Sequence, residues 1–102
     1  MRPIEIERLE TLLQEYEGRF PYIHVEVTPG AFVRNARVQV AKAYARGSGP
    51  YRVALRLEDD GWIRAEGLTH MADEPGRLLL AGHDELGRLT CALQLSTERF
   101  EA

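Results

Sequence analysis

The residues best suited to chemistry in this chain are its histidines and the carboxylates near them. His24 and Glu26 lie two positions apart in an alternating segment, so a strand would direct both side chains to one face. His70 closes the segment WIRAEGLTH, and His83 lies in the stretch AGHDELGR. Imidazole nitrogens and a carboxylate oxygen are ligands that zinc and iron accept. The sequence therefore offers a metal site made of His24, Glu26, His70 and His83, if the fold brings the four together.

The spacing of these residues favours a simpler interpretation. The chain contains no HxH, HExxH or CxxC motif, so no short segment supplies two or three ligands by itself. We therefore expect three separate histidines, each hydrogen-bonded near the surface, and no resident cofactor. A divalent metal such as zinc is the alternative.

Nucleophilic catalysis has little support in the sequence. Cys91, the only cysteine, alternates in phase with Leu89, Leu93 and Leu95. A cysteine among apolar neighbours behaves as a small hydrophobic residue, so we expect Cys91 in the core. A serine nucleophile would require a GxSxG turn, which is absent.

Acid–base catalysis could use a carboxylate beside a histidine, such as Glu66 with His70 or Asp84 with His83. However, Asp84 lies between two glycines in a short polar segment, where acidic residues are favoured by turn geometry. We therefore expect a non-catalytic protein. An enzyme acting on a thiol or sugar conjugate is the less favoured alternative.

A mixture of arginine and aromatic residues gives the strongest indication of binding. The residues that we expect at a binding surface are Arg34, Arg52, Arg56, Trp62, Arg64, His83 and Asp84. Arginine with tryptophan and tyrosine is typical of protein–protein hot spots, although it could also hold an anionic ligand or a single-stranded nucleic acid. The alternative is a solvated face whose arginines pair with Glu26, Glu58 and Glu66. The net charge of −3 makes nucleic acid the least favoured partner.

The elements that position these residues follow from two periodicities. Ile6, Leu9, Leu13 and Tyr16 recur at steps of three or four, which predicts an amphipathic helix over about residues 3–17, with Pro3 in its first turn. After Gly18 the period changes to two, which is typical of half-buried strands.

The alternation predicts strands at residues 22–27, 32–45, 51–57, 62–68, 77–81 and 88–96. The alanine-rich segment 38–45 is also compatible with a helix. Asp59-Asp60-Gly61 predicts a hairpin, and Met71–Gly76 is expected to be a loop.

One helix followed by about six strands indicates a mainly β domain, either an antiparallel sandwich or a partly open barrel. We expect a single domain over residues 1–102, with the β-rich part at 21–100. The segment MRPIEIERLE has no apolar core of a signal peptide, and no apolar run is long enough to cross a bilayer. A cytoplasmic protein is therefore expected, without membrane contact.

Several long strings resemble one protein family: PYIHVE, GAFVRN, GPYRVALRLEDDGWIRAEGLTH, GRLLLAGHDELGRL and ALQLS. Together they resemble the YojF family, small uncharacterised proteins of Gram-positive, bacillus-type bacteria, over residues 21–100. The resemblance implies a β-rich single domain encoded beside a zinc-dependent sugar deacetylase of bacillithiol metabolism, and it supplies no catalytic residues. The chain looks shorter than bacillus-type members around residues 28–32, so a function of that loop is not expected here.

The composition and the resemblance together favour a non-catalytic accessory or protein-binding domain. We expect it to form a homodimer or to bind a protein partner, for example the deacetylase.

Overall fold

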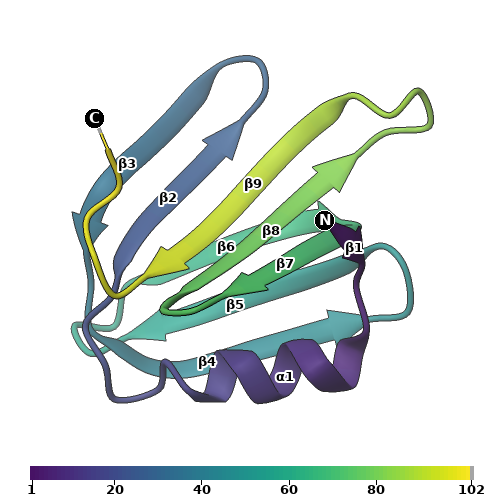
Figure 1. The fold of residues 1–102 in the computed structure, drawn as a ribbon. Helices are drawn as coiled ribbons and strands as arrows, with labels where there is room; N and C mark the ends of the chain where they lie inside the picture. The colour runs from purple at the N-terminus through teal and green to yellow at the C-terminus, as the bar shows by residue number, and fades with distance from the viewer. Residues whose placement is uncertain (102) are drawn as a thin grey trace.

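The computed structural model describes residues 1–101, which form two antiparallel sheets and one helix (Figure 1). The larger sheet has six strands, in spatial order β1 (Arg2–Pro3), β7 (His70–Glu74), β8 (Arg77–His83), β9 (Leu89–Ser96), β2 (Tyr22–Val27) and β3 (Ala31–Arg37). The smaller sheet has three, β4 (Val40–Gly47), β5 (Tyr51–Leu57) and β6 (Trp62–Leu68). The predicted mainly β, antiparallel fold is confirmed, and it is not closed into a barrel.

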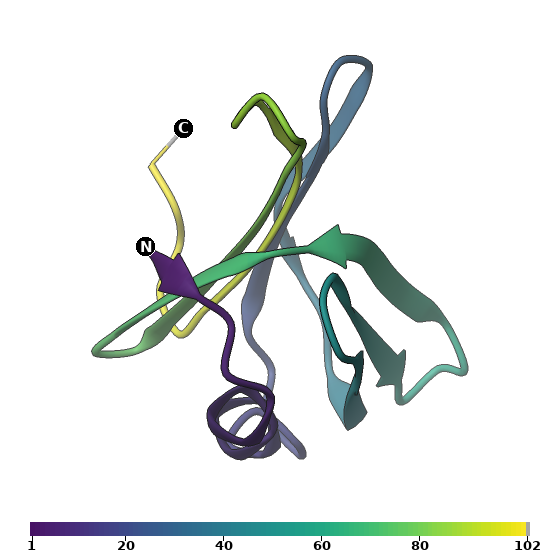
Figure 2. The ribbon, with the colours of Figure 1, turned by 90° about the vertical axis from the view of Figure 1, so that its right-hand side faces the viewer.

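The core lies between the two sheets, and helix α1 (Ile6–Gln14) closes one side beside β4 (Figures 1 and 2). Leu9 and Leu13 of α1 are buried together with Leu55 of β5, Leu80 of β8 and Leu95 of β9. Burying a leucine side chain contributes about 1.5–3 kcal/mol, so this shared cluster is what holds the helix and both sheets together.

The helix is shorter than predicted because both of its ends are tied to strands. Arg2 and Pro3 pair with β7 as strand β1, so Pro3 does not begin the helix. At the other end, Gly18 has φ 79° and donates its N–H to the Val40 carbonyl at 2.8 Å. The apolar stripe of the helix was nevertheless predicted correctly, because Leu9, Leu12 and Leu13 are its buried residues.

Two strand predictions were wrong in detail. The segment 32–45 is split into β3 and β4 because the chain leaves the larger sheet near Val38, and the helical alternative for 38–45 is excluded because β4 is a strand. The expected loop Met71–Gly76 is largely strand β7, in which fully buried Met71 pairs with Leu80. Only one large apolar side chain marks this strand, so alternation alone could not reveal it.

The two sheets come into contact where β6 passes β8 and β9. A Cβ on Gly82 of β8 would overlap the Gly67 carbonyl of β6 and would lie 2.9 Å from the Cys91 sulfur. Cys91 itself packs against the core cluster, but it is half-buried, and its thiol donates to the Glu66 carbonyl at 3.1 Å. The predicted face of Cys91 was correct, and its expected full burial was wrong.

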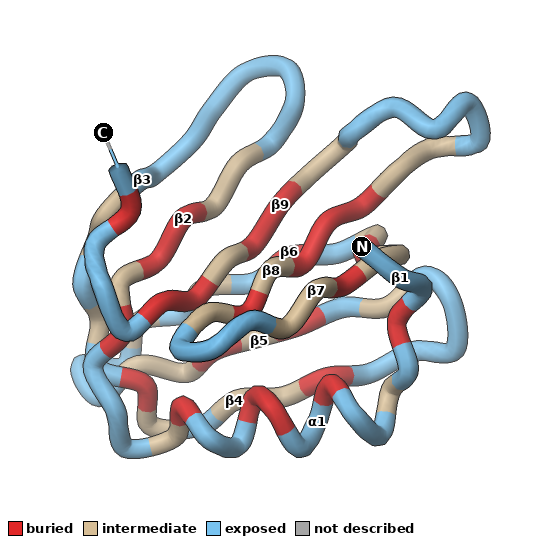
Figure 3. Tube along the Cα trace, viewed as in Figure 1, coloured by how far each residue is buried: buried red, intermediate tan, exposed pale blue. Residues whose placement is uncertain are grey.

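The far ends of the larger sheet extend beyond the smaller one. Figure 3 shows the β2–β3 connection and the β8–β9 turn as exposed segments at one end of the molecule. Exposed Val27, Phe32 and Val33 lie on this hairpin, and Leu86 lies in the turn. Across residues 1–101, no helix is long and apolar enough to cross a membrane.

Candidate functional site

The outer surface of the smaller sheet carries a dense group of cations, which we call the basic face. Val53 and Leu55 of β5 are fully buried, so the alternate residues Arg52 and Arg56 point outwards. Residues directly opposite each other on antiparallel strands share a face, and the register therefore places neighbours from β4 and β6 beside them. The basic face consists of Lys42, Tyr44, Arg46, Arg52, Arg56, Trp62, Arg64 and Glu66.

The predicted binding residues divide between this face and other places. Arg52, Arg56, Trp62 and Arg64 lie together on it, as expected from their alternation. Sequence reasoning placed Tyr44 near this surface but missed Lys42 and Arg46 of β4, because segment 38–45 was compatible with a helix. Lys42, Tyr44 and Arg46 do repeat with a period of two, and that signal could have identified them.

Cations face one another across the strands of the basic face. Lys42 is directly opposite Arg56, and Arg46 is directly opposite Arg52. Like charges in such positions destabilise a sheet. The ion pair on this face joins Arg64 to Glu66 at 3.1 Å, and both side chains are about 60% exposed, so it contributes at most about 1 kcal/mol.

Two aromatic rings lie among these cations. Tyr44 and Trp62 are stacked with ring centroids 6.2 Å apart and an interplanar angle of 27°. The Arg46 guanidinium is 5.8 Å from the Tyr44 ring centre. Trp62 is 57% exposed, so its ring offers apolar surface to a partner.

The charge of the basic face is opposite to that of the rest of the chain. It holds five of the thirteen Lys and Arg residues and one of the sixteen Asp and Glu residues. The remainder of the sequence has eight cations and fifteen carboxylates. A positive field is therefore confined to one sheet surface of an acidic protein, where it can steer an anionic partner.

Arg34 lies away from the basic face, on β3 of the larger sheet. Its guanidinium contacts His24 Nδ1 at 3.2 Å, donates to the Glu101 carbonyl at 2.8 Å and lies 5.1 Å from the Phe100 ring centre. The Asn35 side-chain amide accepts the backbone N–H of Phe100 at 2.7 Å and donates to the Phe100 carbonyl at 2.9 Å. These contacts commit Arg34 to anchoring residues 100–101.

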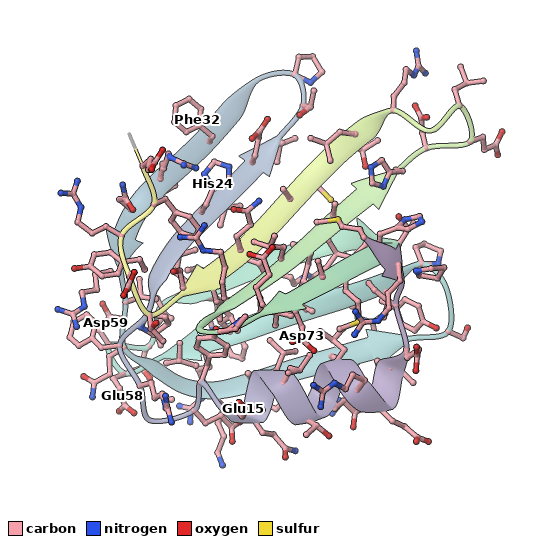
Figure 4. The ribbon with its side chains drawn as sticks, viewed as in Figure 1. Glu15, His24, Phe32, Glu58, Asp59 and Asp73 are labelled. Atoms are coloured by element: carbon pink, nitrogen blue, oxygen red, sulfur yellow. The ribbon has the colours of Figure 1, made fainter. Side chains whose placement is uncertain are left out.

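His24 belongs to the same group of contacts. Its Nε2 lies 3.1 Å from a carboxylate oxygen of Glu26, and its ring lies 6.2 Å from that of Phe32 (Figure 4). His24 is only 7% exposed. The predicted proximity of His24 and Glu26 is therefore confirmed, but Glu26 pairs with a histidine instead of an arginine of the binding surface.

The other two histidines form a separate pair. The ring centroids of His70 and His83 are 5.0 Å apart, with the rings nearly perpendicular. Along β9, the residues opposite His24 and His83 are Gln94 and Leu89, five positions apart, which corresponds to about 16 Å. The four residues of the sequence hypothesis therefore do not form one site, and within residues 1–101 no three His, Cys, Asp or Glu side chains are arranged to hold a metal.

The Asp84 side chain serves to hold the turn in which it lies. Its carboxylate accepts the backbone N–H groups of Leu86 and Arg88 at 2.9 Å and the Arg88 side chain at 2.8 Å. These hydrogen bonds, that from the Arg88 backbone first, lower the pKa of Asp84 below its ordinary value of 3.8. Neighbouring His83 instead borders an open groove of about 660 Å³ between this turn and Pro50.

Comparison with known proteins identifies the family. A family model described as "Protein of unknown function (DUF1806)" matches residues 3–100. The chain belongs to this family. The uncharacterized protein YojF of Bacillus subtilis (strain 168) is 42% identical over 115 aligned positions, covering 98% of both chains. The crystal structure of Bacillus subtilis YojF superposes with a TM-score of 0.91 at 43% identity, covering 99% of this chain and 97% of that one.

The YojF resemblance and the fold that it implied are thus confirmed for this DUF1806 protein. The alignment is longer than the 102 residues of this chain, so the relative carries inserted residues. That these lie in the β2–β3 connection stays a prediction.

Proposed function

We propose that this DUF1806 protein is a non-catalytic binding domain whose basic face docks an acidic surface of a protein partner. The observation that carries the proposal is the pair of like-charge oppositions, Lys42 with Arg56 and Arg46 with Arg52. Such pairs lower the stability of the free protein, and an anionic partner would relieve the repulsion.

The aromatic pair supports a protein partner. Trp62 and Tyr44 provide a rigid apolar contact at the centre of a polar, cationic surface. Tryptophan, tyrosine and arginine are the residue types enriched at binding hot spots, where an apolar anchor is surrounded by charged groups. A partner surface with carboxylates around an apolar pocket would complement both features.

The family resemblance suggests the first partner to test, the zinc-dependent sugar deacetylase of bacillithiol metabolism encoded beside such proteins. The proposed setting is the bacterial cytoplasm. A second copy of this chain is the alternative partner, because the acidic remainder of one molecule could meet the basic face of another. Light scattering distinguishes the two, because only self-association gives a dimer mass without the deacetylase.

The decisive experiment is titration calorimetry of the purified protein with the deacetylase. We expect micromolar or tighter binding, weakened when ionic strength rises from about 0.1 M to about 1 M, since the screening length falls from about 10 Å to about 3 Å. Arg52→Ser with Arg56→Ser should abolish it, whereas Arg99→Ser, an exposed arginine outside the face, should not.

Three outcomes would refute the proposal. The first is a monomeric protein with no heat of binding at micromolar concentration. The second is binding that the double variant leaves unchanged. The third is tight, variant-sensitive binding of a single-stranded oligonucleotide in place of protein, which would reassign the face to nucleic acid.

A further inference from the structure

Two histidines at the end of the larger sheet lie at a distance that suits a shared ligand. His70 of β7 is directly opposite Ala81 of β8, and His83 follows two residues later on β8. Their ring centroids are 5.0 Å apart. Two imidazoles bound to one ion through bonds of about 2.1 Å, at angles near tetrahedral, have centroids about 5 Å apart. The separation of the two rings is therefore compatible with a common metal ion.

Thr69 holds both histidines. Its hydroxyl oxygen is 2.7 Å from His70 Nδ1 and accepts the backbone N–H of His83 at 3.1 Å. The hydroxyl can donate its own proton to the Ala81 carbonyl, 3.4 Å away. In the tautomer in which His70 Nδ1–H donates to Thr69, the lone pair lies on Nε2 and is free to bind an ion. A hydrogen bond that fixes the tautomer of a histidine in this way is the usual support of a metal ligand.

His83 has an atom whose hydrogen-bonding capacity is unused. Its Nδ1 is the one buried side-chain nitrogen or oxygen in residues 1–101 without a hydrogen-bond partner. Buried polar atoms are almost always paired, so an exception needs an explanation, which a bound water molecule or an ion would provide.

An open groove beside His83 gives access from solvent. His83 and Thr69 line the space of about 660 Å³ that extends to Gly67, Thr90 and Pro50. A space of this size admits several water molecules, each of which needs about 30 Å³. Ligands from solvent could therefore complete the coordination of an ion held by two imidazoles.

We propose that His70 and His83 bind one divalent transition-metal ion, with Thr69 as a positioning residue and water in the remaining coordination positions. Imidazole nitrogen suits zinc, nickel and copper, whereas magnesium and calcium require oxygen ligands. This site uses half of the four-residue set suggested by the sequence. It is independent of the basic face, which lies on the other sheet.

The test is titration of the full chain with Zn²⁺ and Ni²⁺, with Mg²⁺ as the control ion. We expect saturable binding of one Zn²⁺ or Ni²⁺ per chain and no binding of Mg²⁺. The imidazole NMR signals of His70 and His83 should shift on Zn²⁺ addition, and those of His24 should not, because its ring nitrogens already contact Glu26 and Arg34.

Variants test the assignment of ligands. His70→Asn and His83→Asn should each weaken Zn²⁺ binding at least tenfold, and Thr69→Val should weaken it about tenfold through loss of the supporting hydrogen bond. Circular dichroism melting verifies that each variant folds. The proposal is overturned if the wild type shows no saturable binding, if the His24 signals are those that shift, or if folded His70→Asn and His83→Asn bind Zn²⁺ like the wild type.

Discussion

Replacing Arg56 by glutamate should make the protein more stable while it abolishes partner binding. Arg56 lies on the central strand of the smaller sheet, directly opposite Lys42 of β4 and Trp62 of β6. Arg64 is its diagonal neighbour on the same face. Arg56→Glu would therefore turn repulsion among cations into attraction.

The size of the effect follows from the strand geometry. Side-chain charges on directly opposite strand positions lie about 5–7 Å apart, where each like pair in water costs about 0.6–0.8 kcal/mol. Reversing one charge replaces this cost by a gain of similar size, and exposure reduces the total to about 0.5–1 kcal/mol. For a domain of this length that corresponds to a rise in Tm of about 2–8 °C.

Thermal unfolding by circular dichroism measures the change. The gain should be largest at low ionic strength and nearly disappear near 1 M salt, where charges are screened beyond about 3 Å. Arg56→Gln should give about half of the gain, because it removes repulsion without adding attraction. Arg99→Glu, outside the basic face, serves as the charge-matched control. Unchanged or lower stability of Arg56→Glu at low salt would refute the like-charge argument, and so would a gain that does not depend on salt.

Four further predictions concern single positions. Trp62→Ala should weaken partner binding more than tenfold, as measured by calorimetry. It should change the free energy of unfolding, measured in urea, by less than about 0.5 kcal/mol, since the side chain is 57% exposed. Gly82→Ala should cost about 3 kcal/mol in urea unfolding, because its Cβ meets a backbone carbonyl, whereas Gly61→Ala meets only flexible side-chain atoms and should change little. Phe100→Ala, which removes a 4% exposed ring held between two arginines, should cost about 2–4 kcal/mol and increase amide exchange in β3. Because the pKa of Asp84 is lowered in the folded protein, its ionised form stabilises the fold above about pH 4, and this contribution is lost as the pH falls through the folded pKa. Asp84→Asn should therefore have a lower urea midpoint than the wild type at pH 7, and the two midpoints should converge in acid.

The sequence was most predictive where the local alternation of apolar and polar residues matches the burial of those residues in the fold. The alternation of Val53 and Leu55 with Arg52 and Arg56 placed the basic side of β5 correctly, because one face of that strand is fully buried. Asp59-Asp60-Gly61 also marked its hairpin, in which Asp60 has φ 69°. Such features depend on a few neighbouring residues and can therefore be read locally.

Other features depend on pairings between distant segments. The contact between His70 and His83 requires β7, whose single buried methionine gave no clear strand pattern. Arg34 was expected at the binding surface, but residues 100–101 at the other end of the chain engage it. Which strands share a sheet is likewise decided by the common core, which alternation cannot reveal.

The placement of the β2–β3 connection explains how relatives could differ in length without losing the fold. Residues 28–30 lie at the tip of a hairpin that extends past the smaller sheet, and every residue from Val27 to Arg34 is exposed (Figure 3). Closing a longer loop there would cost only about 0.6 kcal/mol for each doubling of its length. The hairpin tip is accordingly a natural insertion point, where a tag or a fluorescent reporter could be placed while the basic face and the histidine pair stay intact.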